Sequence, residues 1–126
     1  MHEDWSAFEA LITHIKSAQE KADEANDQAY YYRQQAIRAQ TYASNAAAEA
    51  AILLSEIKLA KLEAPLTAQL EKERVLALKN TVATVLQAAD AVEKANQADR
   101  EVTDAFETVR TLAKRLDEAM REHGKS

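Results

Sequence analysis

The chain has 126 residues, of which 47% are hydrophobic and 29% are charged, and its net charge is −5. This composition predicts one folded domain rather than a disordered chain. One glycine and one proline exclude folds built on many tight turns, the lack of cysteine excludes disulfides and thiolate metal sites, and acids interspersed with bases argue against nucleic-acid binding.

The chain also lacks the apolar segments of membrane-spanning and secreted proteins. Its first residues, Met1 to Trp5, are acidic and do not resemble a signal peptide. The longest uncharged runs are 39–48 and 80–89, whereas a helix needs roughly 20 mostly apolar residues to cross a bilayer. We therefore expect a soluble chain with no transmembrane segment, in a compartment that the sequence does not specify.

The first half of the chain, about 4–63, carries an unbroken seven-residue repeat, which predicts one long helix. No charged side chain interrupts the two apolar series of the repeat. The first series is Phe8, Ile15, Ala22, Ala29, Ala36, Ala43, Ala50, Ile57 and Ala64, and the second is Leu11, Ala18, Ala25, Tyr32, Ala39, Ala46, Leu53 and Ala60. We call these residues the predicted seam of the first helix.

The only proline predicts a chain reversal near 64–66. A residue before proline is pushed out of the helical conformation, and proline itself favours the first turn of a new helix. A kinked continuous helix is the alternative. Reversal would give two arms of nearly equal length, about 4–63 and about 66–122, within a single elongated domain spanning 1–126.

The second arm carries its own apolar series, with steps of 3 and 4 residues. An extra step of 3 at 92, 95 and 98 predicts a local change in helical winding. The series is Val75, Leu78, Val82, Val85, Ala89, Val92, Ala95, Ala98, Val102, Ala105, Val109, Leu112, Leu116 and Ala119. A break at Asn80–Thr81, which could cap a third helix, remains an alternative.

These features together predict an all-α fold, a long antiparallel helical hairpin in the form of an alanine-rich coiled coil. Folding back at the proline places the uncharged runs 39–48 and 80–89 side by side. A seam of alanine buries little apolar area, so a lone hairpin is expected to be marginal. Further apolar residues lie off the seam, and a second hairpin could cover them, completing a four-helix bundle by self-association.

No arrangement of residues predicts catalysis, and we expect no enzyme activity, cofactor, metal or small-molecule substrate. His2 and His123 lie near the chain ends and are expected to be solvated, while His14 lies beside the seam. Neighbouring carboxylates such as Glu71 and Glu73 would need a partly dry pocket to act as acid and base. A thin alanine-seamed hairpin is not expected to provide one.

Aromatic and aliphatic side chains off the seam are the candidate protein-contact residues. Tyrosine and arginine are enriched at the centres of interfaces, and large apolar residues on a second helix face indicate a second contact. The candidates are Tyr30, Tyr31, Ile37, Arg38, Tyr42, Ile52 and Leu86. Tyr32, in contrast, is predicted to fill space in the seam against the small residues Ala95 and Ala98.

The leading functional hypothesis is a non-catalytic structural or protein-protein interaction module, a homo-oligomer with a dimer favoured, or a binder of a partner helix. An amphipathic helical protein on a lipid or granule surface is an alternative, although rows of Lys and Arg are missing. In alanine content and helical texture, though in no motif, the chain resembles the alanine-rich stage-specific coat proteins of trypanosomes. That resemblance implies the mature ectodomain of a cell-surface coat protein, and virion structural components share the same texture.

Overall fold

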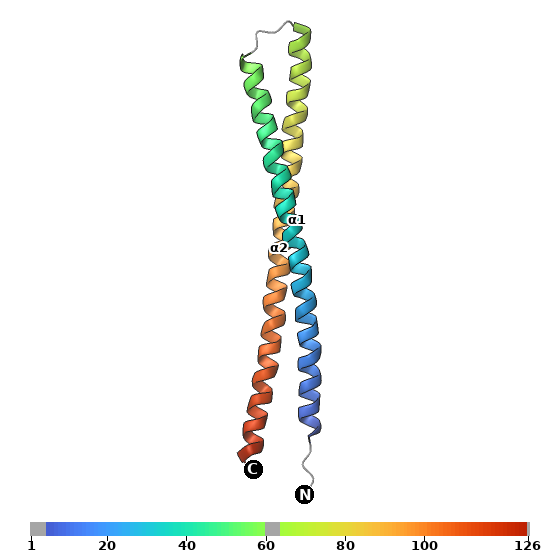
Figure 1. Cartoon of the computed structure of the whole chain (residues 1–126), viewed down its shortest axis with the longest axis vertical. Helices are drawn as coiled ribbons and strands as arrows, with labels where there is room; N and C mark the ends of the chain where they lie inside the picture. Colours follow the sequence, from blue (N-terminus) through green and yellow to red (C-terminus); the bar gives the residue numbers. More distant parts are fainter. Residues whose placement is uncertain (1–4, 60–63, 126) are drawn as a thin grey trace. The chain divides into compact units, whose positions relative to one another are not determined.

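The computed structural model describes residues 5–59 and 64–125, with the side chains of 57–59, 64–67 and 125 left undescribed. Two helices make up this part of the chain, α1 (Ser6–Leu59) and α2 (Ala64–Lys125), and they pack against each other as a hairpin (Figure 1). Both segments are rich in Ala, Leu, Glu, Gln, Lys and Arg, the residues with the highest helix propensity.

The chain reverses direction between the end of α1 at Leu59 and the start of α2 at Ala64, just before the predicted range of 64–66. Because α2 begins at Ala64, Pro65 lies in its first turn, where the missing N–H of proline costs no hydrogen bond. A single kinked helix is therefore excluded. The predicted seam positions 57, 60 and 64 lie outside the described side chains.

The alternative of a third helix beginning at Asn80–Thr81 is wrong, because α2 continues through both residues. The Thr81 hydroxyl donates to the carbonyl oxygen of Ala77 at 2.8 Å, and the Thr84 hydroxyl donates to that of Asn80 at 2.9 Å. Bonds to a carbonyl four residues earlier belong to threonine inside a helix, not to a cap.

Contacts divide the chain into two compact units, each made of one stretch of α1 and one stretch of α2. Unit 1 combines Met1–Tyr31 with Asn96–Ser126, and unit 2 is Tyr32–Ala95. Each unit is described by itself below. The single elongated domain expected from the sequence stays a prediction.

In unit 1 the predicted seam is confirmed on both helices. Ala22 and Ala29 of α1 are fully buried, and Ala98 of α2 is buried as well. The remaining seam residues of the unit are half-buried, namely Phe8, Leu11, Ile15, Ala18 and Ala25 on α1 and Val102, Ala105, Val109, Leu112, Leu116 and Ala119 on α2. Small side chains at the most buried positions let the two helices approach closely.

In unit 2 the predicted seam is confirmed on α1. Its buried residues are Ala36, Ala43, Ala46 and Ala50, with Ala39 and Leu53 half-buried between and beside them. Tyr32 differs from the prediction, because 37% of its surface is exposed and it does not fill a buried space.

The predicted seam of α2 in unit 2 is wrong by one residue from Val75 to Val92, whereas Ala95 is buried as predicted. Val75, Leu78, Val82 and Val85 are 44%, 40%, 60% and 47% exposed. The side chains with low exposure instead lie one position earlier in the chain than each predicted seam residue from Val75 to Val92. They are Arg74, Ala77, Thr81, Thr84, Ala88 and Ala91. This seam runs on to Ala95 and Ala98 in steps of 3 and 4, so the predicted extra step is also wrong.

Candidate contact surface

The seam divides the surface of unit 2 into two sides. Residues that directly precede a seam residue lie on one side of both helices, and residues that directly follow one lie on the other, because each residue advances a helix by about 100° and the helices are antiparallel. The preceding side forms a groove of about 380 Å³ between α1 and α2. Its lining is mostly polar: Tyr42, Asn45, Ala46, Glu49, Asn80, Thr84 and Gln87. We call this side the polar groove.

The opposite side of unit 2 carries no charge between residues 37 and 54 of α1 and between residues 75 and 92 of α2, and we call this part the uncharged face. Beyond it, Arg33 follows Tyr32 and Glu71 follows Leu70. On α1 the uncharged face consists of Ile37, Gln40, Ser44, Ala47, Ala51 and Leu54, and on α2 of Val75, Leu78, Val82, Val85, Ala89 and Val92. Leu54 and Val92 are half-buried, and the other ten residues are exposed. The α2 stripe is the larger and more apolar of the two.

The uncharged face explains why the sequence misplaced the seam of α2. Valine and leucine at steps of 3 and 4 form the pattern that usually marks the buried side of a helix. Here the Ala-rich α1 packs on the smaller Ala and Thr residues of α2, and the larger stripe is left outside. The Val and Leu series needs an extra step of 3 residues to continue to Ala95 and Ala98, whereas the Ala and Thr series continues without one. This irregular step was the signal in the sequence that could have revealed the error.

All seven predicted contact residues are exposed, but they do not lie on one side of the hairpin. Tyr30 and Tyr31 belong to unit 1. In unit 2, only Ile37 lies on the uncharged face. The remaining four lie elsewhere on unit 2, Arg38, Tyr42 and Ile52 on the side of the polar groove and Leu86 on the outer surface of α2. Nothing in the structure tests their role as contacts.

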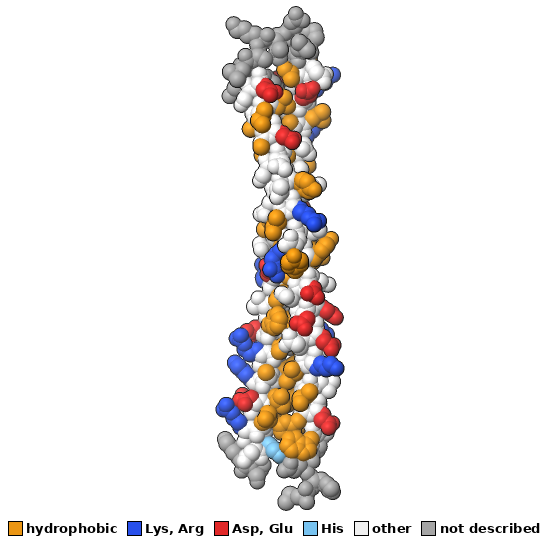
Figure 2. Space-filling model, in the orientation of Figure 1, with side chains coloured by type: hydrophobic (Ala, Val, Ile, Leu, Met, Phe, Trp, Pro, Cys, Tyr) orange, Lys and Arg blue, Asp and Glu red, His pale blue; other side chains and the backbone are white. Residues whose placement is uncertain are grey.

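Figure 2 shows hydrophobic side chains, in orange, at the surface of unit 2 near the chain reversal, with acidic groups, in red, among them. At this end a surface hollow of about 440 Å³ is lined by Val75 and Leu76 together with Glu71 and Lys72. A glutamate and a lysine thus lie beside Val75 at this end of the uncharged face.

The corresponding side of unit 1 is charged. Its residues that directly follow the seam include Glu9, Lys16, Asp23, Asp99, Arg110 and Asp117. A row without charges is therefore not a general property of this hairpin. It distinguishes unit 2.

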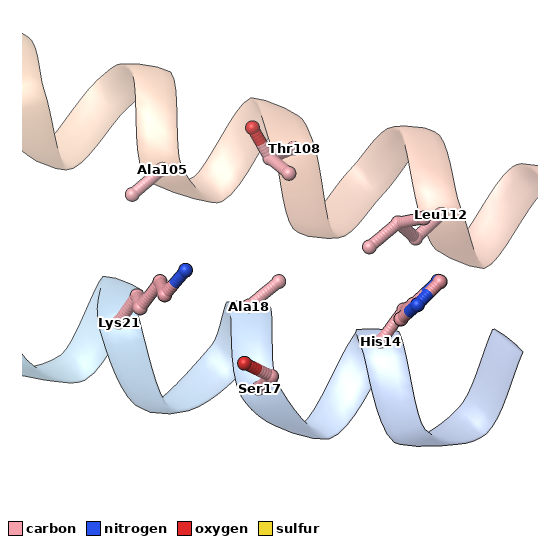
Figure 3. A pocket seen from close by; sticks show the side chains of 7 residues that line it. All are labelled: His14, Ser17, Ala18, Lys21, Ala105, Thr108 and Leu112. Atoms are coloured by element: carbon pink, nitrogen blue, oxygen red, sulfur yellow. The ribbon is translucent and has the colours of Figure 1, made fainter. Parts of the chain in front are cut away.

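Unit 1 has a groove of its own, with a volume of about 340 Å³, between His14 and Lys21 of α1 and Thr108 and Leu112 of α2. In Figure 3 the His14 ring points towards Leu112, and the Ala18 methyl points between the helices. Ala18 and Ala105 are small, so the helices leave space here that no side chain fills. The groove has one imidazole, one amine and no carboxylate.

An aromatic cluster closes the end of unit 1 that contains Trp5 and His123. The ring centroid of Trp5 lies 5.1 Å from that of Phe8 and 4.8 Å from that of His123, and the Phe8 and His123 rings are 5.6 Å apart. His123 is half-buried, so the prediction that it is solvated is wrong. The sequence places Trp5 outside the repeat, which hid this contact. His2 lies outside the described residues.

Within residues 5–59 and 64–125, no three His, Asp or Glu side chains come together as potential metal ligands. Among these same residues, neither helix is apolar over a stretch long enough to cross a membrane. A scan of protein families and comparisons with curated proteins and with solved structures find no match to this chain.

Proposed function

We propose that this protein is a non-catalytic structural module that assembles with a second copy of itself through the uncharged face of unit 2. In this assembly each chain contributes an alanine-rich coiled-coil hairpin, and two hairpins complete a four-helix bundle. The observation that carries the proposal is the outward position of Val75, Leu78, Val82 and Val85, which are 40–60% exposed beside a seam that consists of alanine and threonine except for Arg74.

Burial energies favour a partner on this face. A valine or leucine that moves fully out of water contributes about 1.5 to 3 kcal/mol, while a methyl group contributes about 0.8 kcal/mol. On α2 of unit 2, the hairpin therefore buries mostly small Ala and Thr side chains and leaves a stripe of Val and Leu exposed to water. A second hairpin over the stripe would bury it without changing the seam.

The size of the face also suits a dimer. From Val75 to Val92 the helix rises about 26 Å, and two helices side by side are about 20 Å wide, which gives a projected area on the order of 500 Å² per chain. Accessible area exceeds projected area, so the face approaches the roughly 800 Å² per partner of a standard protein interface.

A second copy is the partner that the face fits best. A two-fold interface places the same surface on both sides. A charged residue in it therefore either faces a residue of the same charge on the second copy or needs an oppositely charged residue elsewhere in the interface. Twelve uncharged residues remove that repulsion. The two stripes also repeat every seven residues on both copies, which is the spacing that packs helices into bundles.

The test compares two substitutions that add the same charge on opposite sides of unit 2. Val82→Glu lies on the uncharged face and Gln87→Glu lies in the polar groove, both at exposed positions of one helix. We expect the wild-type chain of 14.0 kDa to have twice that mass in multi-angle light scattering at micromolar concentration. Val82→Glu should reduce the mass to one chain, and Gln87→Glu should leave it doubled.

Circular dichroism of each variant controls for folding, because both substitutions should retain the helix content of the wild type. A wild-type chain that remains monomeric with full helicity would refute the proposal. So would equal masses for the two variants.

A lipid surface is a less suitable partner for the same face. Its α1 half consists largely of small or polar residues, including Ser44, Ala47 and Ala51, and lacks the bulky apolar side chains that interfacial helices insert. Binding of the wild-type chain, but not of Val82→Glu, to anionic vesicles in a flotation assay would favour the lipid alternative over self-assembly.

A further inference from the structure

A row of charges on α2 borders the uncharged face and has opposite signs at its two ends. The row consists of exposed residues spaced by seven, Lys72, Lys79, Leu86 and Glu93. Seven residues are two helical turns, so these side chains lie in line along the helix. The row is cationic near the start of α2 and anionic at its far end.

The same row on α1 is uncharged. It consists of Gln34, Thr41, Ala48 and Ser55. Only α2 can therefore supply charged groups to both sides of a contact at this border.

The charges of these two rows determine which orientation of two copies is favoured. This inference rests on the proposed self-assembly through the uncharged face. If the copies lay in the same direction about a two-fold axis along the helices, α2 of one would face α1 of the other, and both lysines would meet an uncharged row. If the copies lay in opposite directions, α2 would face α2, and the lysines of each copy would approach the glutamate of the other.

We propose that the second copy lies in the opposite direction, with α2 against α2 and with Lys72 of each copy paired to Glu93 of the other. The apolar stripe is compatible with this register. Val75 would lie opposite Val92 and Val82 opposite Val85 of the second copy, so valine meets valine at the ends and in the middle. With these pairs aligned, Lys72 and Glu93 are offset by only about 3 Å along the axis, which a lysine side chain spans.

Neither charge is used inside the hairpin. Among residues 5–59 and 64–125, the ion pairs of α2 join near neighbours, such as Arg74 with Glu71 at 3.1 Å and Arg110 with Glu107 at 3.2 Å. Lys72 and Glu93 are exposed and belong to no such pair in this part of the chain. Their charges are available to a second copy.

Charge reversal tests the orientation. Lys72→Glu and Glu93→Lys should each weaken the dimer by about three- to tenfold in dissociation constant, since each places like charges together twice per dimer. The double variant Lys72→Glu/Glu93→Lys should return to within about twofold of the wild type. Lys72→Glu paired with Glu49→Lys, a residue of the polar groove, is the matched control and should show no such recovery.

A distance measurement provides a second readout that does not depend on affinity. The chain has no cysteine, so single substitutions Gln87→Cys and Lys94→Cys accept one spin label each. Opposite directions predict axial offsets between the two labels of about 10 Å at position 87 and about 32 Å at position 94, whereas equal directions predict no axial offset at either.

Recovery in the double variant and a longer distance at 94 than at 87 would support the proposal. A double variant as weak as the single ones, or equal distances at the two positions, would overturn it while the doubled mass of the wild type would still support self-assembly. A monomeric wild type would overturn both proposals together.

Discussion

The Thr81 hydroxyl of α2 lies 3.3 Å from the carbonyl oxygen of Ala46 on α1 and 2.8 Å from that of Ala77 on its own helix. One hydroxyl thus bridges the two helices of unit 2 at the point where both are uncharged. The contact requires the backbone of α1 to approach the side-chain layer of α2 closely, which alanine at position 46 permits. It links the two helices through a polar group.

Replacing Thr81 with valine should lower the free energy of unfolding by about 0.5 to 1.5 kcal/mol, because a part-buried hydrogen bond between helices is lost while shape is retained. The measurement is urea denaturation followed by circular dichroism at a fixed protein concentration. Thr41→Val is the control, since the Thr41 hydroxyl bonds only within its helix, to Ile37 at 3.0 Å, and is exposed. An equal effect of the two substitutions would contradict the bridge.

Leucine should have opposite effects at two neighbouring seam positions of unit 1. Ala22 is fully buried, so Ala22→Leu forces the helices apart and should destabilise by about 1 to 3 kcal/mol. Ala18 borders the 340 Å³ groove, so Ala18→Leu has room and should be neutral or stabilise by up to about 1 kcal/mol. Thermal unfolding of both variants decides, and a loss of stability at position 18 equal to that at 22 would show that the groove is not available.

The contact between Trp5 and His123 should be measurable as a coupling energy. Their ring centroids are 4.8 Å apart, and aromatic pairs at this distance typically contribute about 0.5 to 1.5 kcal/mol beyond area burial. A double-mutant cycle with Trp5→Ala and His123→Ala measures the coupling. The same cycle with His14→Ala, an exposed residue lining the groove, should give none. Equal values for both cycles would argue against a specific contact.

The sign of one substitution tests whether α2 is continuous. Asn80 is exposed inside the helix, so Asn80→Ala should stabilise the protein by about 0.5 kcal/mol through higher helix propensity. At a helix N-terminus the same change would cost about 1 kcal/mol through loss of a cap. A decrease in melting temperature would therefore contradict the continuous helix.

The all-helical hairpin could be predicted from the sequence because its determinants are local. Long stretches of good helix formers need no tertiary contact to favour helix, and Pro65 marks the reversal through its own backbone geometry. The α1 seam could also be predicted. Between positions 36 and 50 alanine occupies both series of the repeat, and no second apolar row with the same spacing lies beside them. The aromatic cluster could not, because its rings come from opposite ends of the chain.

The sequence by itself determined that the chain forms two helices, where it reverses and which residues of α1 face α2. Only the tertiary structure decided which stripe of α2 faces α1. Two rows of α2 side chains have the same spacing, one mainly of Ala and Thr and one mainly of Val and Leu, and either could face α1. Hydrophobicity alone predicts that the Val and Leu row faces α1. Close packing between helices selects the Ala and Thr row, because only small side chains fit between backbones that approach closely. The Thr81 side chain lies in this layer, with its hydroxyl 3.3 Å from the carbonyl oxygen of Ala46.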